Sequence, residues 1–326
     1  MKVTVLGAGA WGTALAKILH QSKQAITLWG HDAQHLDELA RTGMNERYLP
    51  GISLPADWRF EPDLARAAAG SECVVVGVPS KAFREVTRAL GSYRGILVSV
   101  TKGIEYDTGL TMCGVLQETV PGATAVALSG PSLALEVSRG VPSAVVAAGP
   151  DPATLQTVQQ LFHRQTFRVY TSADRLGVEL GGALKNVIAI AAGAGDGLGF
   201  GDNSKAALLT RGIAEIRRLG VACGAQAETF AGLGGLGDLA VTCFSRLSRN
   251  RSLGERLGRG EKLEAILAGS VAIAEGYPTA RSAHRLAKKL GVSAPIIDQV
   301  HAVLYEGKNV ARAVEDLTRR ESKAED

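Results

Sequence analysis

Lys185 lies in a stretch of small and apolar residues, where a charged side chain needs a partner. Residues 181–184 before it read GGAL, and residues 187–190 after it read VIAI. A buried ammonium group must find a carboxylate or a ligand, although a lysine on an apolar helix can also extend its charged end to water. We interpret Lys185 as a proton donor to a carbonyl oxygen, where negative charge develops when a ketone is reduced.

Arg249, between Ser248 and Asn250, is the candidate for binding a phosphate group. A guanidinium forms two parallel hydrogen bonds with phosphate oxygens, and neighbouring hydroxyl and amide groups can add more. The alternative is a solvated helix face, because other arginines lie nearby in the sequence. These are Arg246, Arg251, Arg256 and Arg259.

Three further polar residues could act together with Lys185. Asn186 and Asp238 are expected to orient the lysine and the hydroxyl groups of a substrate. Asp238 follows a glycine-rich segment, residues 232–237 (GLGGLG), and could equally cap a helix that begins at Leu239. Lys102 ends a predicted strand, where a lone lysine would often be a surface residue.

Residues 7–12 (GAGAWG) match the G-x-G-x-x-G pattern directly after one predicted strand and at the start of a helix. In a dinucleotide site the first glycine permits a tight turn, the second lets the backbone approach a pyrophosphate, and the third lets the helix pack on the strand. The alternative is a glycine-rich turn without a ligand. The residues expected to bind the cofactor here are Gly7, Gly9, Ala10, Trp11 and Gly12. Trp11 could cover the pyrophosphate or the sheet edge.

The second predicted strand ends in Trp29-Gly30-His31-Asp32. An NAD site usually carries a carboxylate at the end of this strand, which accepts a hydrogen bond from the ribose 2′-OH. Here the carboxylate comes a few positions late, and His31 could meet a 2′-phosphate. We therefore favour NADP over NAD, while His31 and Asp32 could also form a solvated turn or the start of the next helix.

Short apolar runs separated by helical segments predict an α/β fold. The strands are expected at residues 2–6, 25–29, 73–78, 96–100, 124–128, 143–147 and 167–170. Such runs are typical of a parallel sheet covered on both faces. After residue 170 only helices are expected, at 173–194, 204–219, 253–259, 263–268, 280–290, 295–305 and 310–317, with a break at the glycine-rich residues 193–199. We predict a Rossmann-type, mostly parallel domain over residues 1–175 and an all-helical substrate-binding domain over 176–326.

The composition narrows the class of protein. The chain has 326 residues, 46% hydrophobic and 21% charged, with a net charge of +4 and no basic tract, so no nucleic-acid partner is expected. No run approaches about 18 apolar residues, so no membrane span is expected. The four cysteines lie far apart, and His31 and His35 lack a third ligand, so we predict no metal. The start does not resemble a signal peptide, and a cytoplasmic location is expected.

Seven further segments, taken in order with the glycine loop, resemble the NAD(P)-dependent glycerol-3-phosphate dehydrogenases of the bacterial type. They are residues 78–80 (VPS), 101–105 (TKGIE), 129–132 (SGPS), 182–186 (GALKN), 234–238 (GGLGD), 248–250 (SRN) and 274–276 (AEG). The resemblance covers nearly the whole chain. It implies reversible hydride transfer between NAD(P)H and dihydroxyacetone phosphate to give sn-glycerol 3-phosphate, the precursor of phospholipids, by a homodimer.

The resemblance also implies roles for individual residues. Lys185 is the acid and base, and the substrate-binding set is Lys102, Gly130, Ser132, Lys185, Asn186, Asp238, Ser248, Arg249 and Asn250. The cofactor-binding set adds to the glycine loop His31, Lys102, Ala134, Arg249, Ile273 and Glu275. Two other functions remain open at this point: a 3-hydroxyacid or 6-phosphogluconate type dehydrogenase, and a regulator that binds NAD(P)H without chemistry.

Overall fold

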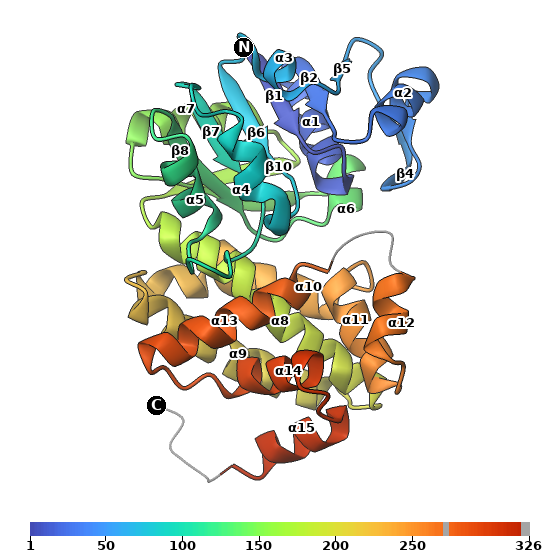
Figure 1. Ribbon diagram of the computed structural model, residues 1–326, viewed down its shortest axis with the longest axis vertical. Helices are drawn as coiled ribbons and strands as arrows, with labels where there is room; N and C mark the ends of the chain where they lie inside the picture. Colours follow the sequence, from blue (N-terminus) through green and yellow to red (C-terminus); the bar gives the residue numbers. More distant parts are fainter. Residues whose placement is uncertain (270–273, 321–326) are drawn as a thin grey trace.

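An eight-stranded sheet forms the centre of the first half of the chain in the computed structural model, which describes residues 1–269 and 274–320 (Figure 1). Its strand order is β10-β9-β8-β7-β6-β1-β2-β5. The strands are β1 (Lys2–Leu6), β2 (Ala25–Trp29), β5 (Arg59–Glu61), β6 (Cys73–Val76), β7 (Ile96–Ser99), β8 (Thr124–Ser129), β9 (Ser143–Ala148) and β10 (Phe167–Ser172). All pairs in this sheet are parallel except β8 with β9.

Both faces of the sheet are buried, as the continuous apolar strands predicted. Val75 of β6 belongs to one buried apolar cluster, while its neighbours Val74 and Val76 belong to another. This alternation follows from the pleat of a strand, which points successive side chains to opposite faces. The covering helices are α1 (Ala10–Gln21), α2 (Ala33–Thr42), α3 (Leu64–Ala68), α4 (Ser80–Arg88), α5 (Met112–Thr119), α6 (Ala134–Ser138) and α7 (Pro152–Phe162).

The second half of the chain is helical (Figure 1). Its α-helices are α8 (Arg175–Gly197), α9 (Asp202–Ala222), α10 (Asp238–Phe244), α11 (Arg249–Gly258), α12 (Leu263–Ala268), α13 (Gly276–Leu290), α14 (Pro295–Tyr305) and α15 (Val310–Thr318). A 3-10 helix (Ala227–Ala231) and a π-helical turn (Leu233–Gly237) precede α10. The fold class predicted from the sequence is therefore confirmed.

Helix α8 is the core of the helical half. It is long and apolar enough to cross a membrane by length and composition, but 83% of its most apolar window is buried inside the fold, which is typical of a core helix. A Cβ on Gly193 would lie 1.9 Å from the carbonyl oxygen of Arg251, and one on Gly254 would lie 1.9 Å from that of Ile190. These glycines therefore allow the backbones of α8 and α11 to lie in contact.

Two details of the prediction were wrong. The helix expected over residues 173–194 continues to Gly197, so the break expected within residues 193–199 comes only at Leu198 and Gly199, and Gly193 and Gly197 instead pack against α11. The sequence also gave no signal for β5 or for the two-stranded sheet of β3 (Met44–Asn45) and β4 (Leu49–Ser53). β3 and β5 have two and three residues, too few for a periodic pattern, and β4 (residues 49–53, LPGIS) contains a proline and a glycine, which are uncommon in strands.

Candidate active site

The glycine loop forms the turn between β1 and α1 that its sequence predicted. Gly7 has φ of +120°, and a Cβ there would lie 2.6 Å from the carbonyl oxygen of Gly77. A Cβ on Gly12 would lie 1.9 Å from the carbonyl oxygen of Gly7, so the third glycine is required by the contact of α1 with the turn. Gly9 precedes α1, and the space around its Cβ position is open for 4 Å.

This arrangement suits a dinucleotide. The space beside Gly9 would admit a pyrophosphate close to the backbone, and the free N–H groups of the first turn of α1 face an anion favourably. In the part of the chain that the structure describes, no side chain caps this helix end. The residues present therefore fit the cofactor that the sequence predicted.

The two glycines give a matched pair of predictions. Gly12→Ala should lower the free energy of unfolding by about 3 kcal/mol, because its methyl group overlaps the backbone. Gly9→Ala should leave this stability within about 0.5 kcal/mol, since the site is open and its φ of −78° suits alanine. It should nevertheless weaken NADPH binding by about tenfold or more, because the methyl group occupies the space left for the pyrophosphate. Urea unfolding of the free protein and calorimetric titration measure the two effects. Unchanged NADPH binding by Gly9→Ala would contradict the assigned position of the pyrophosphate.

Other residues of the predicted cofactor set lie around this turn or across from it. Trp11 packs with Ala10 and Ala134 of α6 in one small apolar cluster, and its ring lies 6.4 Å from that of Phe167. Trp11 therefore contacts the apolar core beside the sheet. Ile273 lies outside the described residues.

Glu275, just before α13, links the two halves of the chain. Its carboxylate accepts hydrogen bonds from the backbone N–H of Ser80 at 3.1 Å and from the Ser80 hydroxyl at 2.5 Å. Burial raises the pKa of Glu275, and these hydrogen bonds and the charge of Arg249 oppose that effect. The start of α4, at the end of β6, is thereby fastened to the helical half.

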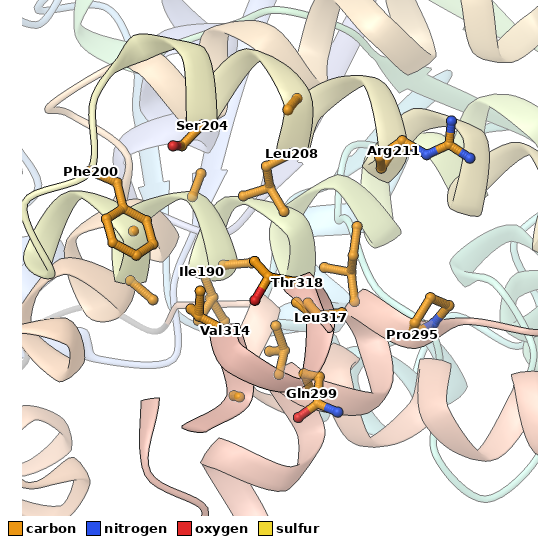
Figure 2. Close-up of a pocket in the computed structure, with 18 of the residues that line it drawn as sticks. Ile190, Phe200, Ser204, Leu208, Arg211, Pro295, Gln299, Val314, Leu317 and Thr318 are labelled. Atoms are coloured by element: carbon orange, nitrogen blue, oxygen red, sulfur yellow. The ribbon is translucent and has the colours of Figure 1, made fainter. Parts of the chain in front are cut away.

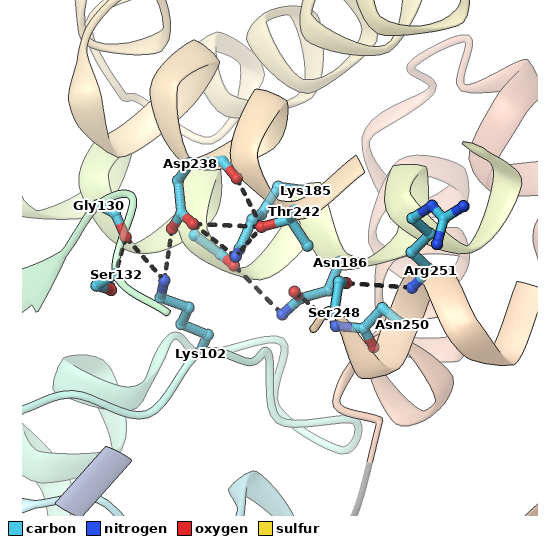
Figure 3. A network of polar contacts seen from close by, with 11 residues as sticks. Lys102, Gly130, Ser132, Lys185, Asn186, Asp238, Thr242, Ser248, Asn250 and Arg251 are labelled. Carbon is cyan, nitrogen blue, oxygen red and sulfur yellow. Dashed lines mark hydrogen bonds and ion pairs between the residues drawn. The ribbon is translucent and has the colours of Figure 1, made fainter. Parts of the chain in front are cut away.

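A network of charged residues lies where the sheet meets α8 and α10 (Figure 3). Asp238 is 1% exposed and contacts two ammonium groups: Lys185 Nζ lies 2.6 Å from Oδ1, and Lys102 Nζ lies 2.5 Å from Oδ2. Lys102 also donates to the carbonyl oxygen of Gly130 at 3.3 Å. Two positive charges and one carboxylate leave this network with one net positive charge, which favours an anionic ligand.

Among residues 1–269 and 274–320, the Lys185 ammonium has partners for two of its three N–H groups. Besides Asp238 it donates to the Thr242 hydroxyl at 2.6 Å, and an ammonium has three N–H groups. Burial lowers the pKa of Lys185 to about 8, against the attraction of Asp238, and the charge of Lys102 lowers it further. A lysine with this pKa can both donate and accept a proton near neutral pH.

Close backbone packing brings these residues together. A Cβ on Gly182 of α8 would lie 2.5 Å from the Ser129 hydroxyl at the end of β8 and 3.5 Å from Cγ of Lys102. A Cβ on Gly181 would lie 2.3 Å from the carbonyl oxygen of Gly234 in the π-helical turn. The two glycines therefore let α8 contact both the sheet edge and the turn that carries Asp238.

Asn186 and Asn250 connect α8 with α11 and α13. The Asn250 side-chain amide donates to Oδ1 of Asn186 at 2.8 Å, and Oδ1 of Asn250 accepts from the backbone N–H of Gly276 at 2.8 Å. Asn186 also donates to the carbonyl oxygen of Gly182 at 3.4 Å. Within the described residues, the hydrogen-bond partners of the Asn186 side chain are therefore Asn250 and Gly182, whereas Asp238 contacts Lys185 directly.

Arg249 is the first residue of α11, directly after Ser248, whose hydroxyl caps the helix by accepting from the N–H of Arg251 at 3.2 Å. The Arg249 side chain is solvent-accessible. The protein around it excludes part of its water, which lowers the pKa of Arg249, and the charge of Glu275 opposes this effect. Neighbouring Asn250 binds Asn186, the residue after Lys185. Lys185 and Arg249, the two predicted cations, therefore lie on α8 and α11, and this hydrogen bond connects the two helices.

Gly130 and Ser132 follow β8 at the same sheet edge (Figure 3). Gly130 has φ of +142°, and a Cβ there would lie 2.9 Å from the Cα of Val145, so another residue would be strained. The Ser132 hydroxyl donates to the Gly130 carbonyl at 2.8 Å, and Lys102 donates to the same oxygen. The turn after β8 is thereby held against the charged network.

Two features of the site escaped sequence reasoning. Thr242 contacts Lys185 because it lies four residues after Asp238 on the same helical face, a spacing that the sequence does show. The interpretation of Asp238 as a helix cap was wrong: it is the first residue of α10, after Gly237, and its side chain binds the lysines. A π-helical turn (Leu233–Gly237) precedes Asp238, so the helical segment begins earlier than at Leu239, where the sequence placed it.

A large cavity lies away from these residues, between α8, α9, α14 and α15 (Figure 2). Its volume is about 1100 Å³. Figure 2 shows Ile190, Val314 and Leu317 facing it, between Phe200 and Pro295. None of the predicted site residues that the structure describes lines this cavity, so the size of the cavity does not mark the site of the chemistry.

Comparisons with known proteins agree over both halves of the chain. A family model described as NAD-dependent glycerol-3-phosphate dehydrogenase N-terminus matches residues 2–155, and the corresponding C-terminus model matches residues 174–315. Glycerol-3-phosphate dehydrogenase [NAD(P)+] of Syntrophotalea carbinolica is 48% identical, covering 100% of this chain and 99% of the relative. The protein of that name in Geobacter sulfurreducens is also 48% identical, over 99% of this chain and 98% of the relative. The crystal structure of glycerol-3-phosphate dehydrogenase from Coxiella burnetii has a TM-score of 0.95 at 37% identity, over 98% of this chain and 99% of that one.

Proposed function

The chain belongs to the NAD(P)-dependent glycerol-3-phosphate dehydrogenase family, and we propose on this basis that Lys185 is the acid and base of its reaction. The protein is an oxidoreductase that transfers a hydride reversibly between NAD(P)H and dihydroxyacetone phosphate, giving sn-glycerol 3-phosphate. The observation that supports the role of Lys185 is its remaining donor: Asp238 and Thr242 fix two N–H groups and leave the third for a substrate oxygen.

In the reductive direction Lys185 donates a proton to the carbonyl oxygen of the substrate and becomes a neutral amine. The nicotinamide ring of the bound cofactor supplies the hydride for the carbonyl carbon. In the oxidative direction the amine accepts the proton of the substrate hydroxyl. The pKa of about 8 makes both forms of Lys185 accessible near neutral pH.

Asp238 and Thr242 hold the lysine in position for this transfer. Asp238 attracts both ammonium groups, and Thr242 fixes the direction of the Lys185 N–H groups. Lys102 contributes a positive charge that stabilises the developing oxyanion and attracts the phosphorylated substrate. We assign Gly130, Ser132, Asn186, Asp238, Ser248 and Asn250 to the substrate side, and the glycine loop, His31, Ala134, Ile273 and Glu275 to the cofactor side. Lys102 and Arg249 are assigned to both.

The decisive assay compares dihydroxyacetone phosphate with unphosphorylated dihydroxyacetone, using NADPH and NADH in turn. We expect turnover with the phosphate ester and little with the free ketone, because the site carries positive charge for a dianion. Equal kcat/KM for the two ketones would contradict the proposed phosphate site. Absence of turnover with both cofactors would contradict the proposed reaction itself.

Arg249→Ala should remove most of the preference for the phosphorylated substrate. A guanidinium–phosphate contact contributes about 1.5–3 kcal/mol, so kcat/KM for dihydroxyacetone phosphate should fall about 10- to 100-fold, mainly through KM. Activity on the unphosphorylated ketone should change little by comparison. Arg259→Ala, which removes an exposed arginine just after α11 that pairs with Glu255, is the matched control and should leave the preference intact. A similar loss in both variants would mean that Arg249 acts through the general charge of the helix.

We propose further assignments that rest on the family as a whole. The product would serve as the backbone precursor of phospholipids, and the enzyme would act as a cytoplasmic homodimer. Residues 1–175 would bind the cofactor and residues 176–326 the substrate. The change from sheet to helices between Ser172 and Arg175 supports this division.

A further inference from the structure

Glu179 is a buried carboxylate on α8 that the proton transfer does not use. Its Oε1 accepts the backbone N–H of Cys113 at 2.7 Å, and its Oε2 accepts the Thr111 hydroxyl at 2.9 Å. Nε of Arg175, one turn earlier on the same helix, lies 3.9 Å from Oε2. Burial raises the pKa of Glu179, and these hydrogen bonds and the charge of Arg175 oppose that effect.

The groups that bind Glu179 belong to a helix of the sheet half. Thr111 is the residue before α5, and Cys113 is the second residue of that helix. The first N–H groups of a helix lack partners within the helix, and the helix dipole favours a carboxylate beside them. Glu179 therefore caps α5 from the helical half, and its two hydrogen bonds fasten α8 to the sheet half at this point.

Thr111 also ends the loop that begins with Lys102, residues 101–111. Ile104 pairs with Thr111 in an antiparallel bridge, so the loop is folded back on itself. The Ile104 side chain is buried in the apolar cluster that α8 forms with its neighbours in the helical half. One end of this compact loop thus carries Lys102, and the other end is bound to Glu179.

The two lysines of the charged network lie on the elements that Glu179 joins. Lys185 comes six residues after Glu179 on α8, which is about 9 Å along the helix axis. Both ammonium groups contact Asp238, Lys102 at 2.5 Å and Lys185 at 2.6 Å. The loop of residues 101–111 is therefore held at both ends, by Asp238 and by Glu179.

We infer that Glu179 is a positioning residue, which holds the loop of residues 101–111 against α8 and so keeps the Lys102 ammonium close to that of Lys185. The inference rests on the proposed function, because it concerns the lysine assigned to the proton transfer. Without Glu179 the loop loses one of its two attachments. Lys102 then spends less time beside the site and stabilises the developing oxyanion less.

The position of Lys102 also affects the pKa of Lys185. The positive charge of Lys102 lowers this pKa, whereas Asp238 raises it. Cys243 on α10 is a further titratable group near Lys185. A Lys102 that moves away removes its repulsion and leaves Asp238 to Lys185 alone, and both changes raise the pKa of Lys185.

Glu179→Ala should therefore move the pH profile of dihydroxyacetone phosphate reduction to higher pH. The descending limb should shift up by about half a pH unit or more, and kcat near neutral pH should fall about tenfold. Glu179→Gln keeps an acceptor for the Cys113 N–H and an amide that can bind Thr111, so its kcat should stay within about threefold of the parent. A limb that stays in place, or that moves to lower pH, in Glu179→Ala would overturn the inference.

Glu215 on α9 provides the matched control. It is also a buried carboxylate, and it accepts the N–H groups of Ile296 at 3.0 Å and Ile297 at 2.8 Å at the start of α14. Glu215→Ala removes the same kind of helix cap inside the helical half. It should lower stability but leave the descending limb and kcat near the parental values. An equal shift in Glu179→Ala and Glu215→Ala would show that the profile follows stability, and would overturn the inference.

Chemical modification of Lys102 tests the inference without turnover. Its side chain is 18% exposed and its ammonium is bound to Asp238, so acetic anhydride should modify it slowly in the free parent protein. Peptide mass spectrometry should show several-fold faster acetylation of Lys102 in Glu179→Ala and an unchanged rate in Glu215→Ala. Thr111→Val, which removes only the hydroxyl, should give a smaller increase and serves as the test if Glu179→Ala does not fold.

Parental rates of Lys102 acetylation in the Glu179 and Thr111 variants would overturn the inference. This outcome is distinct from failure of the proposed reaction, which would appear as absence of dihydroxyacetone phosphate reduction by the parent protein.

Discussion

Replacing Lys185 by alanine is expected to lower kcat for dihydroxyacetone phosphate reduction about 10²- to 10⁴-fold, the usual contribution of a positioned proton donor. NADPH binding should stay within about twofold of the parent, because Lys185 contacts Asp238 and Thr242 rather than the glycine loop. The Asp238 charge remains compensated by Lys102. Single-turnover kinetics and NADPH titration measure the two quantities. Equal losses of turnover and of cofactor binding would contradict the assigned role.

A lysine–aspartate pair outside the site provides the control for this variant. Lys205 Nζ lies 2.7 Å from Asp196, and the two side chains are 11% and 12% exposed. Lys205→Ala therefore removes a comparably buried ion pair without touching the charged network at α10. It should lower stability while leaving kcat nearly unchanged. A drop in kcat similar to that of Lys185→Ala would show that the loss follows from stability.

Asp238→Asn is expected to lower the free energy of unfolding by about 3–5 kcal/mol, because two ammonium groups would lose their buried carboxylate. It should also move the pH profile. In the parent the protonated fraction of Lys185 falls as pH rises through about 8, so the reductive rate should fall above this pH and the oxidative rate should rise towards it. Asp238 raises the pKa of Lys185, so its replacement should lower that pKa and shift the reductive limb to lower pH.

Asp196→Asn is the matched control for this shift. Asp196 also pairs with two cations, Lys205 at 2.7 Å and Arg251 at 2.6 Å, but lies elsewhere in the helical half. Asp196→Asn should lower the free energy of unfolding, because two cations would lose their carboxylate, and it should leave the pH profile unchanged. Profiles of kcat for reduction between about pH 6 and pH 10 compare the two variants. If the reductive limb of the pH profile does not shift in Asp238→Asn, Lys185 is not the acid whose titration sets that limb.

Local patterns in the sequence were sufficient for the glycine loop and the main strands. The roles of Gly7 and Gly12 depend on a tight turn and on a close helix, both formed by neighbouring residues in the chain. The apolar runs of β1, β2 and β6 form buried strands because their side chains can be covered on both faces. The same runs carry no information about strand direction, so the antiparallel pairing of β8 with β9 could not be predicted.

The sequence by itself determined that residues 1–175 contain a sheet with a dinucleotide-type turn, and that Lys185 lies in an apolar helix. Only the tertiary structure decided the partners of that lysine. Lys102 and Asp238 are 136 residues apart in sequence, and they meet because glycines let α8 approach the sheet edge and the π-helical turn. Glu179 meets Thr111 in the same way, although the two residues are 68 residues apart in sequence. Local hydrogen bonding and apolar periodicity are properties of short segments, whereas a shared carboxylate depends on how distant segments pack.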